Sequence, residues 1–336
     1  MVTRERPTLE AVARRAGVSR ATVSRVVNGS TSVAASIREA VNRAVDELGY
    51  VPNQAARSLV TQRTESIALI LPETANRVFS DDLFFPAIIR GAGVELEAAD
   101  KQLVLMMAGS ARSHDRVERY AVAGHVDGVM FASMHGADPL PGTLVRLGIP
   151  VICSGRPIGA ADVPYVDVDH FGGVAAAVRH LVAQGRKRIA TIAGPQDMVA
   201  GIDRLAGYRA TLEEAGLPQR TAFGDFTRES GLAAMRSLLE ADPTLDAVFA
   251  ASDMMAHGAL VALRQAGRRV PGDVAVIGFD DFEISRYSDP PLTTVRQPIA
   301  DMGRTMARQL LGLINGDPAL PDAVVLPTEL IVRDSA

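Results

Sequence analysis

Residues 8–29 read TLEAVARRAGVSRATVSRVVNG, a pattern that predicts two short helices separated by a tight turn. Thr8 and Ser19 are suitable N-caps for these helices, and Gly17 lies in the turn between them. A third helix, over about residues 33–48, completes a small unit. Its expected core is Leu9, Val12, Ala13, Val23, Val26, Val27, Ile37, Val41, Ala44, Val45 and Leu48. Such a helix-turn-helix can place the start of its second helix in the major groove of DNA.

Charge is divided unevenly along the 336 residues of the chain. Residues 1–63 contain ten arginines, no lysine and five acidic residues, so they carry a net charge of +5, whereas the rest carries −9. A basic segment attracts a polyanion and an acidic one repels it. The distribution favours a nucleic acid as the partner of residues 1–63, with a merely solvated basic surface as the alternative.

Composition and short motifs exclude several other classes of protein. Hydrophobic residues make up 47% of the chain and charged residues 22%, as in soluble globular proteins of two or three folded units. The single cysteine, Cys153, cannot form an intramolecular disulfide, and the start MVTRERPTLE lacks the apolar stretch of a secretory signal. We therefore expect a cytoplasmic protein without a membrane span. The sequence contains no nucleophile elbow, P-loop or metal-ligand spacing, so no metal, no cofactor and no enzymatic activity are expected.

The residues after position 63 repeat one pattern twice. Segments 66–72 (SIALILP) and 188–195 (RIATIAGP) are short, almost wholly apolar strands, each followed by a loop and an amphipathic helix. Further strands are expected at 126–132 and 149–155 in the first half and at 245–251 and 274–280 in the second. Each half therefore alternates strands and helices around a parallel sheet, and two such halves enclose a cleft at the carboxyl ends of their strands.

Longer stretches of the sequence identify a family. The string at 8–29, the segment ELGYVPNQAARSL (47–59), and the later segments YVDVDHFGG (165–173), RLAGYRATLEEAGL (204–217) and VPGDVAVIGFDD (270–281) resemble the LacI/GalR family of transcriptional repressors. The resemblance extends along the whole chain. It implies a DNA-binding head, a hinge helix and a body like that of periplasmic sugar-binding proteins. Within the family, TIAGPQDMVAG and FSDDLFFP are most similar to actinobacterial cellobiose-responsive members.

The predicted fold class is α/β, with a three-helix head and a hinge helix followed by a two-lobed body of two doubly wound parallel sheets. The expected boundaries are 1–51 for the head, 52–63 for the hinge and linker, 64–161 with 293–322 for the first lobe, and 162–292 with 323–336 for the second lobe. No leucine heptad follows the last strand, so a homodimer is expected in preference to a tetramer.

The resemblance assigns DNA contacts to the head and the hinge. Arg20 and Ala21 match the two positions that discriminate operators, and an arginine there can pair with guanine O6 and N7. Leu59 matches a leucine that wedges open a central base step when two hinge helices pair in the minor groove. The other expected DNA-binding residues are Thr8, Ser19, Thr22, Ser24, Arg25, Asn28, Asn53 and Ala56. These assignments predict double-stranded DNA with a palindromic operator and a central pyrimidine–purine step.

The resemblance likewise places an effector, expected to be a small sugar, between the lobes. Arg204 matches an arginine that grips effector hydroxyls or carboxylates, and Asp280 matches an acceptor of sugar hydroxyl groups. Phe226 stands where sugar-responsive members present an aromatic platform. The complete set of expected effector-binding residues is Glu73, Arg156, Arg204, Phe226, Ser252, Asp280 and Gln297.

Departures from the family pattern bear on the size of the effector. Ser252 replaces a common asparagine, and Gly155 replaces a common aspartate. The shorter side chains would enlarge the site for a disaccharide such as cellobiose. Alternatively, they are smaller residues with no effect on the choice of effector. Asp253 is expected to cap the helix that begins at Met254, and Asp281 is interpreted as a helix-start carboxylate. Core packing is the expected role of Phe79, Phe84 and Phe85.

The preferred hypothesis is a repressor of sugar-utilisation genes that the effector releases from its operator by changing the angle between the lobes. A solute-binding protein would explain the two-lobed body but not the basic head. A corepressor-type regulator, in which the ligand strengthens DNA binding, has the same fold and the opposite response.

Overall fold

The computed structural model describes residues 7–27, 30, 32–51, 63–80, 83–159 and 162–336. It divides into two compact units, Met1–Thr64 and Glu65–Ala336, called the head and the body below. The predicted hinge helix, with Asn53, Ala56 and Leu59, lies outside the described residues, and so does Asn28.

The head contains the predicted helix-turn-helix and a third helix. Its helices are α1 (Leu9–Ala16), α2 (Arg20–Val27) and α3 (Ala35–Leu48). Thr8 caps α1, because its Oγ1 accepts a hydrogen bond from the backbone N of Ala11 at 3.3 Å. Gly17 ends α1 in the left-handed conformation (φ 68°), which a glycine adopts without strain. The local signals in the sequence therefore explain where these helices begin and end.

The core of the head is small and almost wholly aliphatic. Its buried members are Val12, Ala13, Val23, Val26, Val41, Ala44 and Tyr50. Ile37 was expected in this core, but 37% of its surface is exposed. It lies in the first turn of α3 and is not part of the packed cluster of the head.

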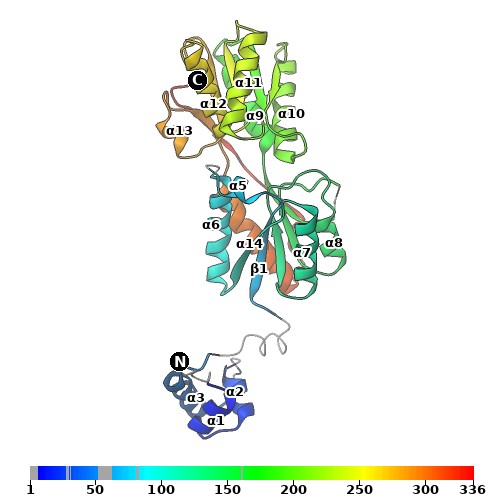
Figure 1. Cartoon of the computed structure of the whole chain (residues 1–336), viewed down its shortest axis with the longest axis vertical. Helices are drawn as coiled ribbons and strands as arrows, with labels where there is room; N and C mark the ends of the chain where they lie inside the picture. Colours follow the sequence, from blue (N-terminus) through cyan, green and yellow to red (C-terminus); the bar gives the residue numbers. More distant parts are fainter. Residues whose placement is uncertain (1–6, 28–29, 31, 52–62, 81–82, 160–161) are drawn as a thin grey trace. The chain divides into compact units, whose positions relative to one another are not determined.

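The first lobe of the body is built on a six-stranded parallel sheet with the order β11-β5-β4-β3-β1-β2. The strands are β1 (Ser66–Leu71), β2 (Gln102–Met107), β3 (Gly128–Phe131), β4 (Val151–Ser154), β5 (Tyr165–Val168) and β11 (Ala323–Leu326). The helices are α5 (Ala75–Val78), α6 (Phe84–Ala98), α7 (Ala111–Val122), α8 (Leu140–Arg146) and α14 (Ile299–Asn315). Helices α6 and α14 pack together on one face and α7 and α8 on the other (Figure 1). Right-handed crossovers place α6 and α7 on opposite faces, because the chain crosses the sheet in opposite directions from β1 to β2 and from β2 to β3.

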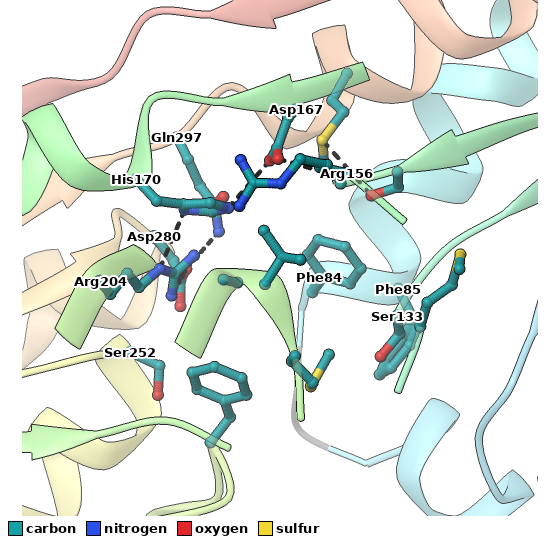
Figure 2. Close-up of a pocket in the computed structure, with 18 of the residues that line it drawn as sticks. Phe84, Phe85, Ser133, Arg156, Asp167, His170, Arg204, Ser252, Asp280 and Gln297 are labelled. Atoms are coloured by element: carbon teal, nitrogen blue, oxygen red, sulfur yellow. Dashed lines mark hydrogen bonds and ion pairs between the residues drawn. The ribbon is translucent and has the colours of Figure 1, made fainter. Parts of the chain in front are cut away.

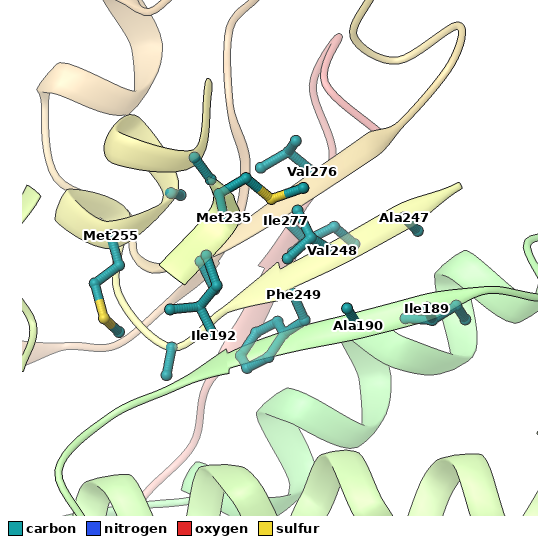
Figure 3. Close-up of a cluster of buried hydrophobic side chains, with 14 of the residues drawn as sticks. Ile189, Ala190, Ile192, Met235, Ala247, Val248, Phe249, Met255, Val276 and Ile277 are labelled. Carbon is teal, nitrogen blue, oxygen red and sulfur yellow. The ribbon is translucent and has the colours of Figure 1, made fainter. Parts of the chain in front are cut away.

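The second lobe repeats this arrangement with the order β12-β10-β9-β8-β6-β7. Its strands are β6 (Ile189–Ala193), β7 (Thr221–Phe223), β8 (Ala247–Ala250), β9 (Ala275–Asp280), β10 (Thr293–Arg296) and β12 (Glu329–Ile331). Its helices are α9 (His170–Ala183), α10 (Val199–Glu214), α11 (Arg228–Ala241), α12 (Asp253–Gln265) and α13 (Ile284–Tyr287). Side chains of β6, β8 and β9 form a continuous apolar core with those of α11 and α12 (Figure 3).

The strand pairing corrects two expectations about the body. The edge strand β12 pairs with β10 in the antiparallel direction, so the second sheet is not wholly parallel. The expected lobe boundaries at 161/162, 292/293 and 322/323 also differ from the pairing. Strands β5 and β11 belong to the first sheet and β10 to the second, so the chain passes between the lobes after β5, after β10 and between β11 and β12. Each pass lies a few residues later than predicted.

The longest helix of the body, α14, is amphipathic and packs against the first sheet. Within the described part of the chain, no helix combines the length and the apolar character needed to cross a membrane. Cys153 is buried in β4, inside the first lobe.

Candidate effector cleft and DNA-binding surface

A cleft lies between the two lobes at the carboxyl ends of their strands, where ligands of open α/β sheets bind. The space between its lining atoms is about 900 Å³, part of which is open to solvent. Six of the seven side chains predicted for effector binding line it, namely Arg156, Arg204, Phe226, Ser252, Asp280 and Gln297. In Figure 2, Arg204, Asp280 and Ser252 lie on one side of the pocket and Phe85 and Ser133 on the other.

Arg204 is the central cation of the cleft. It projects from α10 and only 4% of its surface is exposed. Its Nη1 donates to the carbonyl oxygen of Ala251 at 2.5 Å and lies 3.7 Å from Oδ1 of Asp280. Its guanidinium carbon lies 3.7 Å from the ring centroid of Phe279 and 5.6 Å from that of Phe226. The buried charge is therefore compensated by a carboxylate, a carbonyl group and two aromatic faces.

His170 extends this polar network toward the first lobe. The Nε of Arg204 donates to Nδ1 of His170 at 3.2 Å, so Nδ1 is unprotonated and Nε2 carries the ring hydrogen. Nε2 lies 3.2 Å from Oδ1 of Asp167, which accepts this hydrogen. Burial and the nearby Arg204 lower the pKa of His170, so the imidazole is neutral near pH 7. Asp167 and His170 were not predicted as cleft residues.

Asp280 and Gln297 form the second polar pair of the cleft. Nε2 of Gln297 donates to Oδ1 of Asp280 at 2.5 Å, and both residues are buried. Asp280 has a φ of 121°, and the cleft residues Ser133 and Phe226 also have positive φ values, 60° and 67°. Residues other than glycine rarely adopt this conformation, and they keep it only where the surrounding structure holds them there. Such strained residues are concentrated at functional sites.

Phe226 forms part of the apolar wall of the second lobe. Its ring lies directly over Gly194, where an added Cβ would approach the ring carbons to 2.4 Å. A side chain at position 194 would therefore displace the aromatic face. This explains the glycine in the segment TIAGP.

Charged groups face one another across the mouth of the cleft, with the cations in the first lobe and the carboxylates in the second. His135 Nδ1 lies 2.9 Å from Oδ2 of Asp197, and Arg156 Nη2 lies 3.2 Å from Oδ1 of Asp203. The backbone N of Gly136 also donates to the carbonyl oxygen of Asp197 at 2.7 Å. We call these contacts the cross-cleft pairs. They join the lobes in the conformation that the structure describes.

Glu73 is the predicted effector residue that does not line the cleft. Its Oε1 accepts a hydrogen bond from the hydroxyl of Ser133 at 2.7 Å and lies 3.1 Å from Nε2 of His135. Hydrogen bonding to Glu73, followed by the contact with Asp197, raises the pKa of His135 to about 9, although partial burial opposes the shift. Glu73 therefore keeps His135 protonated at neutral pH.

Three further expectations at the cleft are wrong. Ser252, not Asp253, caps α12, since its Oγ accepts from the backbone N of Met255 at 3.2 Å. Asp281 does not start a helix, because α13 begins only at Ile284, and it instead pairs with Arg296 at 2.8 Å and Arg333 at 2.5 Å. Phe79 is 70% exposed, whereas Phe85 is buried in the first lobe and Phe84 is partly buried beside it.

Asp253 is a buried anchor behind the cleft wall. Its Oδ2 accepts hydrogen bonds from the backbone N of Phe282 at 2.9 Å and the hydroxyl of Ser285 at 2.6 Å. Its Oδ1 accepts from the hydroxyl of Thr294 at 2.6 Å. Burial raises the pKa of Asp253 to about 7.

Phe282 is a contact between the lobes that the sequence did not reveal. It follows β9 of the second lobe, yet its ring packs with the buried apolar cluster of the first lobe and lines the cleft. Its N–H bond to Asp253 fixes the backbone that carries this ring.

The described DNA-binding candidates lie at the start of α2 and around it. Arg20, Ala21 and Arg25 are exposed. The Oγ of Ser19 accepts from the backbone N of Thr22 at 3.1 Å, and the two side-chain oxygens are 2.8 Å apart, so these residues also stabilise the first turn. Thr8 is exposed and Ser24 is partly buried.

This combination of features defines the class of ligand-responsive DNA-binding regulators: a helix-turn-helix head, two α/β lobes and a polar cleft between the lobes. Residues 8–53 match the family described as "Bacterial regulatory proteins, lacI family", and residues 178–336 match the "Periplasmic binding protein-like domain". The chain is 50% identical over 340 residues to the HTH-type transcriptional regulator CelR of Thermobifida fusca, which covers 100% of both chains. The chain described here therefore belongs to the lacI family and is a transcriptional regulator.

Solved structures give the same result for the fold. A "transcriptional regulator CelR-cellobiose complex" matches with 48% identity and a TM-score of 0.78, covering 98% of this chain and all of that one. A lac repressor dimer bound to operator and the anti-inducer ONPF matches with 28% identity and a TM-score of 0.87, covering 98% and 99% of the two chains. These relatives are regulators, which agrees with the absence of catalytic motifs noted in the sequence.

Proposed function

We propose that this protein is a cytoplasmic, homodimeric repressor that binds a palindromic operator through its heads and releases it when cellobiose or a related β-linked disaccharide occupies the cleft. The observation that carries the proposal is the cleft, in which Arg204 and Asp280 lie side by side between aromatic faces. The similarity to CelR and to its cellobiose complex supports this choice of effector.

A neutral sugar fits the chemistry of this site. Asp280 accepts hydrogen bonds from sugar hydroxyls, and Arg204 donates to their oxygens. A hydrogen bond to a charged group contributes about 1.5–3 kcal/mol, more than one between neutral groups. Phe226 offers a flat apolar face to the C–H groups of a sugar ring. Ser252 and Gly155 contribute little side-chain volume to the cleft, which favours a disaccharide over a monosaccharide.

The response follows from the two-lobed architecture. An effector that contacts both lobes stabilises the conformation with one particular angle between them. It shifts the equilibrium between two such conformations only as far as its affinities for them differ. Two hinge segments that pair on DNA at one spacing would be separated by this rotation. By linkage, the operator must weaken effector binding by the same factor by which the effector weakens operator binding.

We expect His135 to make the stability of the body depend on pH. Its pKa of about 9 lies above the ordinary value of 6.5, so its contribution to the cross-cleft pairs is complete below about pH 6.5 and is lost as the pH rises through 9. Because His135 is partly exposed, the free energy of unfolding should fall by no more than about 1 kcal/mol between pH 7 and 10 on its account. Chemical denaturation of the protein and of His135→Gln at both pH values measures this. An equal fall in the variant would show that another group is responsible.

Arg20 is expected to carry most of the base discrimination of the head. Arg20→Ala should remove about 1–3 kcal/mol of preference for guanine at one base pair of each half-site. The affinity for nonspecific duplex should decrease only slightly, because the variant loses one positive charge. Arg43→Ala, which removes a charge from α3, is the control. Equal discrimination in the Arg20 variant and the wild-type protein would contradict this role.

The first experiment is fluorescence anisotropy with duplexes selected from random DNA, at fixed salt concentration, with mono- and disaccharides added. Selection of a palindrome and its release by cellobiose is the expected result. Tighter binding on adding a ligand would instead show the corepressor response. Failure to select any DNA would favour a solute-binding protein.

A further inference from the structure

An ion pair between Glu10 and Arg20 joins the two helices of the helix-turn-helix. Glu10 lies in the first turn of α1, and Arg20 is the first residue of α2. Nε of Arg20 lies 2.9 Å from Oε1 of Glu10, and their side chains are 69% and 56% exposed. The pair therefore lies at the surface where α2 begins, which is the part of the head proposed to meet base edges.

Arg20 contacts Glu10 through Nε, and this determines which of its N–H groups remain available for hydrogen bonds to a base. An arginine has one N–H on Nε and two on each Nη. The O6 and N7 atoms of guanine accept two parallel hydrogen bonds from such a planar fork. A carboxylate on Nε leaves the Nη groups available for this pairing and restricts the rotation of the guanidinium plane.

The first turn of α1 favours the charged form of Glu10. Its backbone N–H is the main cause of the lowered pKa of the Glu10 carboxyl, and the Thr8 hydroxyl and Arg20 add to it. The carboxylate is therefore ionised at neutral pH, and it lies in the first turn of the helix that Thr8 caps. Its ion pair with Arg20 reduces the rotamer freedom that Arg20 would otherwise lose on binding DNA.

We propose that Glu10 is a positioning residue that orients Arg20 toward guanine and so sets the sequence specificity of operator binding. This inference rests on the proposed role of Arg20 in reading bases. A carboxylate beside DNA also repels phosphates, which weakens binding to every sequence equally. Glu10 therefore lowers the affinity for nonspecific DNA and raises the discrimination between operator sequences.

The test compares Glu10→Gln with Glu47→Gln in the full-length protein. Glu47 of α3 pairs with Arg15 of α1, and both of these side chains are also about half exposed, so the control removes the same charge and breaks a similar pair. Anisotropy measures the affinity of each protein for the selected operator, for operators with one guanine replaced at a time, and for nonspecific duplex. Glu10→Gln should reduce the discrimination at the base pair sensed by Arg20 about three- to tenfold, with nonspecific affinity unchanged or higher. Glu47→Gln should leave the discrimination unchanged.

Arg20→Ala identifies the base pair and separates the possible failures. Adding Glu10→Gln to Arg20→Ala should cause no further loss of discrimination, since the two residues act as one unit. If Arg20→Ala loses discrimination and Glu10→Gln retains it, the positioning role of Glu10 is wrong and the reading of bases by Arg20 stands. If Arg20→Ala retains discrimination at every position, the proposed role of Arg20 is wrong, and the role of Glu10 falls with it.

Discussion

Replacement of Arg204 by alanine is expected to weaken cellobiose binding at least about 100-fold, equivalent to about 2.7 kcal/mol. The substitution removes the donors proposed to bind sugar oxygens and leaves Asp280 without the neighbouring positive charge. It also removes the cation that lies over the ring of Phe279. The operator should remain bound at cellobiose concentrations that release the wild-type protein. Calorimetry measures the first effect and anisotropy the second.

Two variants make this result specific to the cleft. Arg209→Ala removes an exposed arginine from the same helix and should leave cellobiose binding unchanged. Arg204→Lys keeps the charge but not the planar fork, so it should recover only part of the affinity. An Arg204→Ala protein that binds cellobiose within threefold of wild type would exclude Arg204 as an effector ligand.

Replacement of Asp253 by alanine should lower the free energy of unfolding of the body by about 3 kcal/mol or more, because three buried donors lose their acceptor. The donors belong to the segment after β9, to α13 and to β10, so the loss loosens the wall that carries Phe282. Thermal unfolding followed by circular dichroism should show a lower melting temperature, with the cellobiose affinity also reduced in the remaining folded protein.

The controls for Asp253 test whether hydrogen bonding is the cause. Asp253→Asn retains an acceptor oxygen and nearly the same shape, and the Ser285 and Thr294 hydroxyls can reorient, so it should lose much less stability than alanine. Asp301→Ala removes an exposed carboxylate of α14 that pairs with Arg304, and a loss below about 1 kcal/mol is expected. Equal melting temperatures for Asp253→Ala and Asp301→Ala would contradict the anchoring role.

Most features that depend on neighbouring residues in the sequence were predicted correctly, except that Ser252 and not Asp253 caps α12 and that Asp281 starts no helix. The caps at Thr8 and Ser19, the turn at Gly17 and the alternation of strands and helices follow from local spacing and backbone preference. The resemblance to the family placed Arg204 in the cleft. It also placed Asp280 there, and the position of Asp280 at the carboxyl end of a strand gives a second reason, because parallel strands point their carboxyl ends toward the cleft.

Features that depend on distant pairing were not predicted. Strand β5 belongs to the first sheet because it pairs with β4 and with β11, which lies more than 150 residues further along the chain. With β5 assigned to the other lobe, nothing indicated that Asp167 and His170, at and after its end, would face the cleft. Phe282 was missed because an apolar residue near a strand end gives no sign that it packs against the opposite lobe.

The three passes of the chain between the lobes constrain how such a protein can be recombined. Either lobe consists of segments separated in the gene, so its exchange with that of a relative needs a cut at each pass. The head is one continuous segment that ends near Thr64 and needs a single junction. Exchange of the head by gene fusion can therefore change the operator that the regulator recognises, and it needs fewer junctions than exchange of one lobe. Effector preference must consequently change mainly by point substitution.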